Sequence, residues 1–248
     1  PKTRRDFVRL TAAAGGVVGL GLVPKLARAT PAPARKPLSI LILGGTGFIG
    51  PHHVEYAIKR GHKVTLFNRG KTNPGLFPEA EKLEGDRDGK LEALKGRSWD
   101  AVIDNSGYVP RHVRDSATLL KGRVKRYLFV STLSVFADFS KKGIDEDAPL
   151  APLTEPGSED SRKHYGPLKA LCEQEVRTAF GAGATIVRPG LIVGPGDTTD
   201  RFTYWPVRID RSGEILAPGD PNDHVLIIDA RDLCEWCVHL VENDVGGV

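Results

Sequence analysis

The stretch that decides the fold is residues 38–50, which read LSILILGGTGFIG. Its first half is a short, nearly continuous apolar run, which predicts a strand buried on both faces of a parallel sheet. The glycine-rich second half is followed by Val54 and Ile58 at helical spacing and then by Gly61, which is suited to end a helix. The apolar run 64–67 comes next. The sequence therefore predicts a strand, a glycine loop, a helix and a second strand.

Three glycines of this loop each have a specific structural role between the predicted strand and helix. Gly44 permits a tight turn, Gly47 lets the backbone approach a pyrophosphate, and Gly50 lets the helix pack closely on the strand. The N-terminus of the helix then faces the phosphate charge. Because the required strand and helix flank the loop, we interpret it as a dinucleotide-binding loop rather than an ordinary glycine-rich turn. The loop residues expected beside the ligand are Gly44, Thr46, Gly47, Phe48, Ile49 and Gly50.

Strand and helix patterns alternate through the rest of the chain. The further predicted strands are 82–84, 101–104, 127–130 and 184–187, and the further predicted helices are 90–94, 111–120 and 168–180. This alternation predicts an α/β fold, a Rossmann-type doubly wound parallel sheet. The predicted organisation is a linker at 30–37, a nucleotide-binding domain at 38–190, and a small, incomplete C-terminal substrate lobe at 191–248.

The first 29 residues have the layout of a secretory signal, with a basic start, the apolar run 10–23 and an Ala-x-Ala motif at the end. Arg4 and Arg5 before Phe7 resemble the twin-arginine signal, which a receptor reads and whose route carries folded proteins. We therefore expect an exported, periplasmic protein with the twin-arginine machinery as a partner. The apolar run is shorter than the roughly 20 residues of a spanning helix, so tethering by an uncleaved signal is the alternative.

Charge and composition narrow the functional classes. The formal net charge is +4, but residues 1–29 alone carry a net +5, which leaves −1 for the rest of the chain. The basic balance therefore belongs to the leader and gives no support for a nucleic-acid partner. Three cysteines in 248 residues exclude a scaffold built on disulfides.

The second predicted strand ends in Asn68-Arg69-Gly70-Lys71. An acidic residue near this point binds the ribose 2′-hydroxyl of NAD in dinucleotide-binding folds. Asn68 carries no charge that would repel a 2′-phosphate, and Arg69 with Lys71 can pair with one. We therefore predict NADP as the preferred cofactor, with NAD as the alternative.

Two residues suggest proton-transfer chemistry. Tyr165 and Lys169 are four positions apart at the start of a predicted helix, so both side chains lie on one face. An ammonium group beside a phenol is expected to lower the phenol pKa from about 10 and to favour the phenolate. Hydroxyls at 131 and 132 follow a predicted strand, where they can meet a ligand or satisfy a turn.

Residues 38–240 resemble the extended short-chain dehydrogenases/reductases, in particular the NAD(P)-dependent epimerase/dehydratase group. The resemblance is carried by Gly44-x-x-Gly47-x-x-Gly50, Ser131-Thr132 before Val135-Phe136, Tyr165-x-x-x-Lys169, Arg188-Pro189-Gly190 leading to Gly194-Pro195-Gly196-Asp197, and Ile228-Asp229-Ala230-Arg231-Asp232-Leu233.

The resemblance implies a role for each matching residue. Tyr165 is the general acid or base, Lys169 activates it and holds the nicotinamide ribose, and Thr132 completes the catalytic set. Asp86 is expected to contact the adenine. The resemblance departs at Phe136-Ala137, where the family usually has tyrosine and glycine. As a whole, the resemblance implies an NAD(P)-dependent epimerase/dehydratase-type oxidoreductase acting on a hydroxyl-bearing small molecule.

A non-catalytic dinucleotide sensor is the alternative function, because Asn68-Arg69-Gly70 is closer to atypical members of the family. For the substrate, Tyr108, Arg201 and Tyr204 are expected at the cleft, and a sugar or nucleotide-sugar would suit such groups.

Two further patterns are interpreted as structural. Cys234 and Cys237 lie inside an apparent helix, away from its N-terminus, so we expect core packing rather than redox chemistry. His52 and His53 are adjacent and therefore point in different directions on a helix, so no metal site is expected.

Overall fold

The computed structural model describes residues 31–220 and 222–248, of which Ala32–Val248 form one compact unit. The predicted export signal, residues 1–29, lies outside the described residues. The strands are β1 (Ser39–Leu43), β2 (Lys63–Asn68), β3 (Glu81–Glu84), β4 (Trp99–Asp104), β5 (Val124–Val130), β6 (Ala184–Val187), β7 (Leu191–Val193) and β8 (Ile227–Asp229). The α-helices are α2 (Gly50–Lys59), α3 (Pro110–Leu120), α4 (Tyr165–Phe180), α5 (Tyr204–Asp210) and α6 (Ala230–Glu242).

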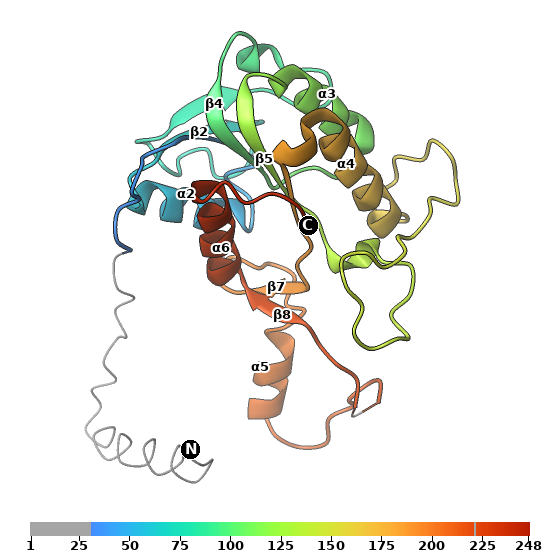
Figure 1. The fold of residues 1–248 in the computed structure, drawn as a ribbon. Coiled ribbons are helices and arrows are strands. Elements are labelled where there is room, and N and C mark those ends of the chain that lie inside the picture. The colour runs from blue at the N-terminus through green and yellow to red at the C-terminus, as the bar shows by residue number, and fades with distance from the viewer. Residues whose placement is uncertain (1–30, 221) are drawn as a thin grey trace, which may run out of the picture. The chain divides into compact units, whose positions relative to one another are not determined.

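The main sheet has six strands in the order β3-β2-β1-β4-β5-β6, and all its pairings are parallel (Figure 1). The chain proceeds from β1 to one edge and then returns to the other side of β1. The strand order therefore reverses between β1 and β4, and ligands bind at such a switch point, beside the carboxyl ends of the strands. The predicted doubly wound parallel sheet is confirmed.

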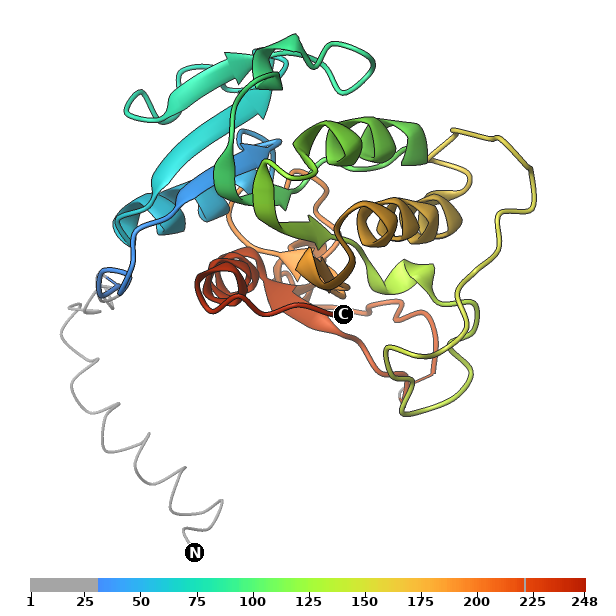
Figure 2. The same ribbon diagram turned by 45° about the horizontal axis from the view of Figure 1, so that its top comes forward.

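Helices cover both faces of this sheet (Figures 1 and 2). Helices α3 and α4 pack on one face, and α2 and α6 pack on the other. In β1, Leu41 faces the core that includes α3 and α4, whereas Ile40 and Ile42 face the core that includes α2 and α6. Successive side chains of a strand point to opposite faces. A sheet covered on both faces therefore needs apolar residues at successive positions, as the run 38–43 has.

Helix α6 belongs to the nucleotide-binding core. Leu233 and Cys237 are fully buried in the same cluster as Val54 of α2. Beyond α6, the N–H of Ile186 in β6 donates to the carbonyl of Gly247 at 2.8 Å. Within the predicted lobe at 191–248, α6 thus packs into the core of the nucleotide-binding domain, while β7 and β8 form a separate two-stranded sheet.

The predicted helix at 90–94 is wrong in extent. The structure has a single 3-10 turn at Glu92–Leu94. The backbone groups of Lys90 instead pair with those of Asp86, at 2.9 and 3.1 Å, across a turn in which Gly89 has φ +74°. This turn uses the hydrogen bonds that a helix starting at 90 would need.

The described part of the predicted linker is attached to the domain. The N–H of Ala34 donates to the carbonyl of Arg60 at 2.8 Å, and the Arg60 guanidinium donates to the carbonyl of Ala32 and to both carboxylate oxygens of Glu242. Within residues 31–220 and 222–248, none of the helices has the length and apolar character that crossing a bilayer requires.

Candidate active site

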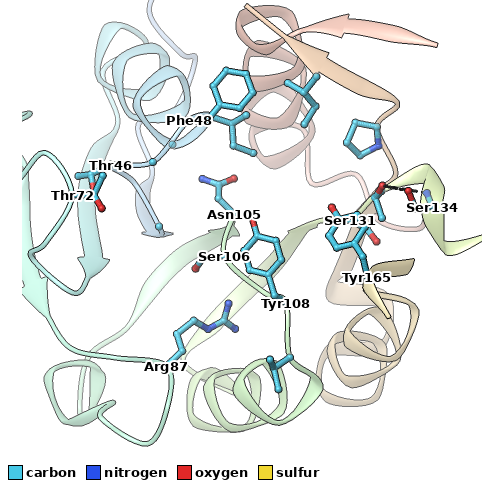
Figure 3. Close-up of a pocket in the computed structure, with 18 of the residues that line it drawn as sticks. Thr46, Phe48, Thr72, Arg87, Asn105, Ser106, Tyr108, Ser131, Ser134 and Tyr165 are labelled. Atoms are coloured by element: carbon cyan, nitrogen blue, oxygen red, sulfur yellow. Dashed lines mark hydrogen bonds between the residues drawn. The ribbon is translucent and has the colours of Figure 1, made fainter. Parts of the chain in front are cut away.

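A cleft of about 970 Å³ opens at the carboxyl ends of the central strands. Its volume lies near the upper end of the range of roughly 300–1,000 Å³ for small-molecule and cofactor sites. Figure 3 shows Thr46 and Phe48 on the glycine-loop side, with Tyr165 and Ser131 across the cleft. The predicted site residues that line it are Gly44, Thr46, Gly47, Phe48, Ile49, Gly50, Asn68, Arg69, Asp86, Tyr108, Thr132, Tyr165 and Arg201.

The glycine loop forms a close-packed cradle. A Cβ atom added to Gly50 would lie 2.3 Å from the Gly44 carbonyl oxygen and 2.6 Å from the Gly45 carbonyl carbon. These are backbone atoms, which cannot move aside as a flexible side chain can. A Cβ atom added to Gly47 would meet no protein atom within 4 Å, although Gly47 lines the cleft. Gly50 therefore serves packing, whereas Gly47 leaves space for a ligand.

Two of the side chains that line the cleft, one after β4 and one after β5, have buried polar atoms without a partner among the described residues. Within the described part of the chain, both amide atoms of Asn105 and the hydroxyl of Ser131 have no hydrogen-bond partner. A buried polar atom without a partner costs about 1–3 kcal/mol. Asn105 follows β4 beside the glycine cradle and Ser131 follows β5 across the cleft, and the amide and hydroxyl groups of a dinucleotide would pair with their atoms. The residues of the cleft therefore fit a nicotinamide dinucleotide.

Asn105 was not among the predicted site residues. Its sequence signal is its place directly after the apolar run 101–104, because the carboxyl ends of parallel strands meet at the ligand crevice. The same reasoning selected the hydroxyls after β5.

A buried ion pair holds the end of β4, and it was also missed. Arg87 Nη1 donates to Asp104 Oδ1 at 2.6 Å, and the Tyr127 hydroxyl donates to Asp104 Oδ2 at 2.7 Å. The Ser106 N–H donates to Asp104 Oδ1 at 3.0 Å. Burial raises the pKa of Tyr127 well above its usual value. The network thereby fixes the loop that carries Asn105, with Arg87 at the cleft (Figure 3).

Tyr165 begins α4 and faces the cleft, with 38% of its surface exposed (Figure 3). Burial raises the pKa of its phenol, while a hydrogen bond with Thr132 and the charge of Arg201 act in the opposite direction. Thr132 Oγ1 also accepts from the Ser134 N–H at 3.2 Å, so it caps the short turn after β5. The two interpretations of this hydroxyl are therefore compatible: it satisfies a turn and lies beside Tyr165.

Lys169 does not line the cleft and is almost completely buried. Its ammonium donates to the carbonyls of Val130 and Gly107 at 2.6 and 2.9 Å, and lies 4.0 Å from the centroid of the Phe129 ring. Burial lowers the pKa of Lys169 to about 8. The expected lowering of the Tyr165 pKa is therefore wrong for this structure, because the ammonium is directed at two carbonyls and burial dominates the phenol.

This buried lysine predicts a specific dependence of stability on pH. Its folded pKa of about 8 is below the ordinary value of 10.5, so the unfolded chain binds more protons between these pH values. Stability rises with pH in such an interval. The cost of Lys169 is therefore present below pH 8 and disappears toward pH 10.5. In urea unfolding, the free energy of unfolding of the wild type should therefore rise relative to that of Lys169→Met over this interval. A constant difference would contradict the burial of a charged ammonium.

Of the two tyrosines predicted to contact the substrate, one lines the cleft and the other does not. Tyr108 lines the cleft with its ring centroid 6.4 Å from that of Tyr165, and burial raises its pKa. Tyr204 does not line the cleft, which corrects its expected place. It lies on α5, is 54% exposed, and packs edge-on against the neighbouring Trp205 at 5.1 Å.

The packing supports the interpretation of the two cysteines, and the two histidines point in different directions. Cys234 and Cys237 are free, buried thiols within α6, and burial raises the pKa of Cys237 to about 12. Burial lowers the pKa of His53 to about 3, and its Nδ1 lies 3.2 Å from the Cys234 sulfur. His52 points elsewhere and donates to the Pro195 carbonyl at 2.9 Å. In the described parts of the chain, no three His, Cys, Asp or Glu side chains are grouped to hold a metal ion.

Known proteins share this fold and parts of this sequence. The chain is 30% identical to the 2-alkyl-3-oxoalkanoate reductase of Stenotrophomonas maltophilia, over 76% of this chain and 60% of that protein. It is 28% identical to the chloroplast stem-loop binding protein of 41 kDa b of Arabidopsis thaliana, over 83% of this chain and 55% of the relative. The chain thus spans less than two thirds of the length of either relative.

The structure also resembles that of a dTDP-glucose 4,6-dehydratase from Bacillus anthracis solved with NAD. The TM-score is 0.63 at 20% identity, over 82% of this chain and 71% of that one. At this identity the likeness concerns the fold alone. The model of the NAD dependent epimerase/dehydratase family matches residues 40–248. With its glycine cradle and six-stranded parallel sheet, the chain belongs to the NAD dependent epimerase/dehydratase family.

Proposed function

We propose that this chain forms the cofactor-binding part and the catalytic end of an NAD(P)-dependent oxidoreductase of the epimerase/dehydratase type, acting on a hydroxyl-bearing carbon. The observation that supports the proposal is the shared cleft, in which the glycine cradle and the unpaired atoms of Asn105 and Ser131 lie together with Tyr165. A sensor that only binds the dinucleotide would not need a phenol at this place.

The residues have distinct roles in this proposal. The loop 44–50 binds the pyrophosphate with backbone N–H groups, and Asp86 binds the adenine. Asn105 and Ser131 would hold the nicotinamide end, and the bound cofactor would supply hydride transfer there. Tyr165, with its raised pKa, is protonated near neutral pH and donates a proton to a substrate carbonyl. The reverse step needs a phenolate, and Lys169 would favour it by leaving the Gly107 carbonyl and approaching Tyr165.

The proposed preference for NADP rests on Arg69. Its side chain is exposed at the end of β2, lines the cleft, and forms no hydrogen bond or ion pair with another described residue. The Asn68 amide oxygen accepts from the Gly70 N–H at 3.1 Å and carries no negative charge. A human epimerase family protein with a similar fold was solved with NADPH, at a TM-score of 0.58 and 22% identity.

Replacing Arg69 with alanine is expected to weaken NADP binding and to leave NAD binding nearly unchanged. A charge-assisted contact with the 2′-phosphate contributes about 1–3 kcal/mol, or roughly ten- to hundredfold in affinity. Titration calorimetry with both cofactors measures the ratio of the affinities for NADP and NAD. The same measurement on Lys71→Ala, at the same edge of the cleft, reports whether the effect is specific to Arg69. Equal affinities of the unmutated protein for NADP and NAD would contradict the proposal.

We also propose export by the twin-arginine route, on the basis of Arg4 and Arg5. Outside the cytoplasm no replenished pool of NADP(H) is expected, so the enzyme should carry its cofactor and restore it within each catalytic cycle, as an epimerase or dehydratase does. Native mass spectrometry of protein from the exported fraction tests the function and the location together. The expected mass includes one tightly bound dinucleotide per chain. Recovery of an empty protein that binds NADP weakly and reversibly would favour the sensor function.

A further inference from the structure

We infer that the substrate end of this cleft takes a hydroxy acid or oxo acid with an apolar body. The acid group would pair with Arg201, and the apolar part would lie against side chains from two segments, the β5–α4 connection and the residues before β8. The inference rests on the proposed function and specifies its substrate class. The apolar side chains concerned are Leu133, Phe139, Val225 and Leu226.

Arg201 has the features of a carboxylate-binding residue. It lines the cleft, and its charge acts on the Tyr165 phenol. Its Nε donates to Thr199 Oγ1 at 2.8 Å, and that hydroxyl donates to Asp197 Oδ1 at 2.6 Å, which orients the guanidinium. The two terminal nitrogens of Arg201 form no hydrogen bond with any residue that the structure describes. Two such nitrogens bind a carboxylate through two parallel hydrogen bonds.

Three apolar side chains that line the cleft together with Arg201 are exposed. The exposed fractions are 57% for Phe139, 70% for Val225 and 64% for Leu226, although all three line the cleft. Scattered exposed apolar residues need no explanation, but several gathered at one concave site mark a ligand or partner surface. Because these residues line the same cleft as Tyr165 and Arg201, a small molecule with a charged end and an apolar body fits them.

This apolar wall is attached to the core of the domain. The Phe139 ring packs edge-on against the buried Phe136, with centroids 6.3 Å apart. The Leu226 carbonyl accepts from the Leu191 N–H at 2.8 Å, which joins β7 to the segment before β8. A Cβ atom added to Gly190 would lie 2.5 Å from the same carbonyl, so the two segments are closely packed. The wall therefore has a defined position.

The same part of the cleft is poor in the amide and carboxylate groups that bind the hydroxyls of a sugar. Among the described residues that line the cleft, the amides and the carboxylate belong to Asn68, Asp86 and Asn105, which lie at or just after the ends of β2, β3 and β4 on the cofactor side. The substrate side has hydroxyls near the reacting centre and Arg201 and His224 as its basic side chains. Several sugar hydroxyls buried against leucine, valine and phenylalanine would lose their hydrogen bonds to water without replacement.

The experiment compares acids with their methyl esters, using the full natural chain loaded with oxidised cofactor. The probes are 3-hydroxy acids of four to ten carbons, their methyl esters, and UDP-glucose. Binding is measured by titration calorimetry, and turnover by nicotinamide absorbance. We expect affinity for the acids to rise by up to about fourfold per methylene, from the free energy of burying one CH₂. The acids should bind at least about tenfold more tightly than the esters.

Variants separate the charge from the apolar wall. Arg201→Gln should reduce the affinity for the acids at least about tenfold, and the affinity for the esters less than about twofold. Arg208→Gln is the matched control, since Arg208 lies on α5, donates to the Ser212 carbonyl at 2.8 Å and does not line the cleft. Leu226→Ser should reduce the gain in affinity that each added methylene of the acid gives.

The possible results distinguish this inference from the proposed function. Tighter binding of UDP-glucose than of every acid, with dinucleotide binding intact, would overturn the inference alone. Equal affinity for acids and esters would do the same. A protein that binds no dinucleotide at all would overturn the proposed function first.

Discussion

Replacing Gly50 with alanine is expected to destabilise the protein and to remove its affinity for nicotinamide dinucleotides. The added Cβ would lie 2.3 Å from the Gly44 carbonyl oxygen, so the backbone of the loop must move. Overpacking of this kind costs about 1–3 kcal/mol in the free energy of unfolding. Displacing the loop also removes charge-assisted hydrogen bonds to the pyrophosphate, each worth about 1.5–3 kcal/mol, so affinity should fall by at least about hundredfold.

Gly47→Ala separates packing from binding. Its Cβ would meet no protein atom within 4 Å, so the free energy of unfolding should change by less than about 0.5 kcal/mol. The same Cβ would occupy the space beside the loop where we expect the pyrophosphate, so affinity should still fall by about tenfold or more. Gly75→Ala is the control, because Gly75 also has open space around it and lies outside the cleft.

Urea unfolding and titration calorimetry with NADP measure the two effects independently. Wild-type affinity in Gly47→Ala would contradict the place assigned to the pyrophosphate. Wild-type stability in Gly50→Ala would contradict the packing of the loop.

Tyr165→Phe is expected to abolish turnover while leaving dinucleotide binding within about threefold of wild type. General acid–base catalysis contributes about 10²–10⁴-fold to rate, and phenylalanine keeps the ring but removes the proton that is transferred. Tyr204→Phe makes the same chemical change on an exposed ring outside the cleft, so it should leave turnover unchanged.

Steady-state rates and calorimetry on both variants give the comparison. Undiminished turnover in Tyr165→Phe would exclude the phenol as the proton donor. A loss of cofactor affinity larger than the loss of turnover would point to a binding role instead.

The sheet could be predicted because its signals are local. Strands covered on both faces need apolar residues at successive positions, so 38–43 indicates β1 without knowledge of its neighbours. The glycine loop joins that strand to α2 by a turn with a recognised residue pattern. The spacing of Tyr165 and Lys169 placed both on one helix, where the structure has α4.

Other features depend on partners that are distant in the sequence. Lys169 has a helical position that the sequence indicates, but its direction is set by the carbonyls of Gly107 and Val130, 62 and 39 residues away. The amphipathic pattern of α6 indicates a helix but not the core against which it packs. Arg87 and Asp104, 17 residues apart, look like separate surface charges until the fold brings them together.

A crystal structure of the full natural chain with NADP tests the central claim most directly. We expect the pyrophosphate against the loop 44–50, the 2′-phosphate beside Arg69, and the nicotinamide ring in contact with Ser131 and within reach of Tyr165. Lys169 should have left the Gly107 carbonyl for the nicotinamide ribose. A dinucleotide bound outside this cleft, or a nicotinamide ring far from Tyr165, would contradict the account.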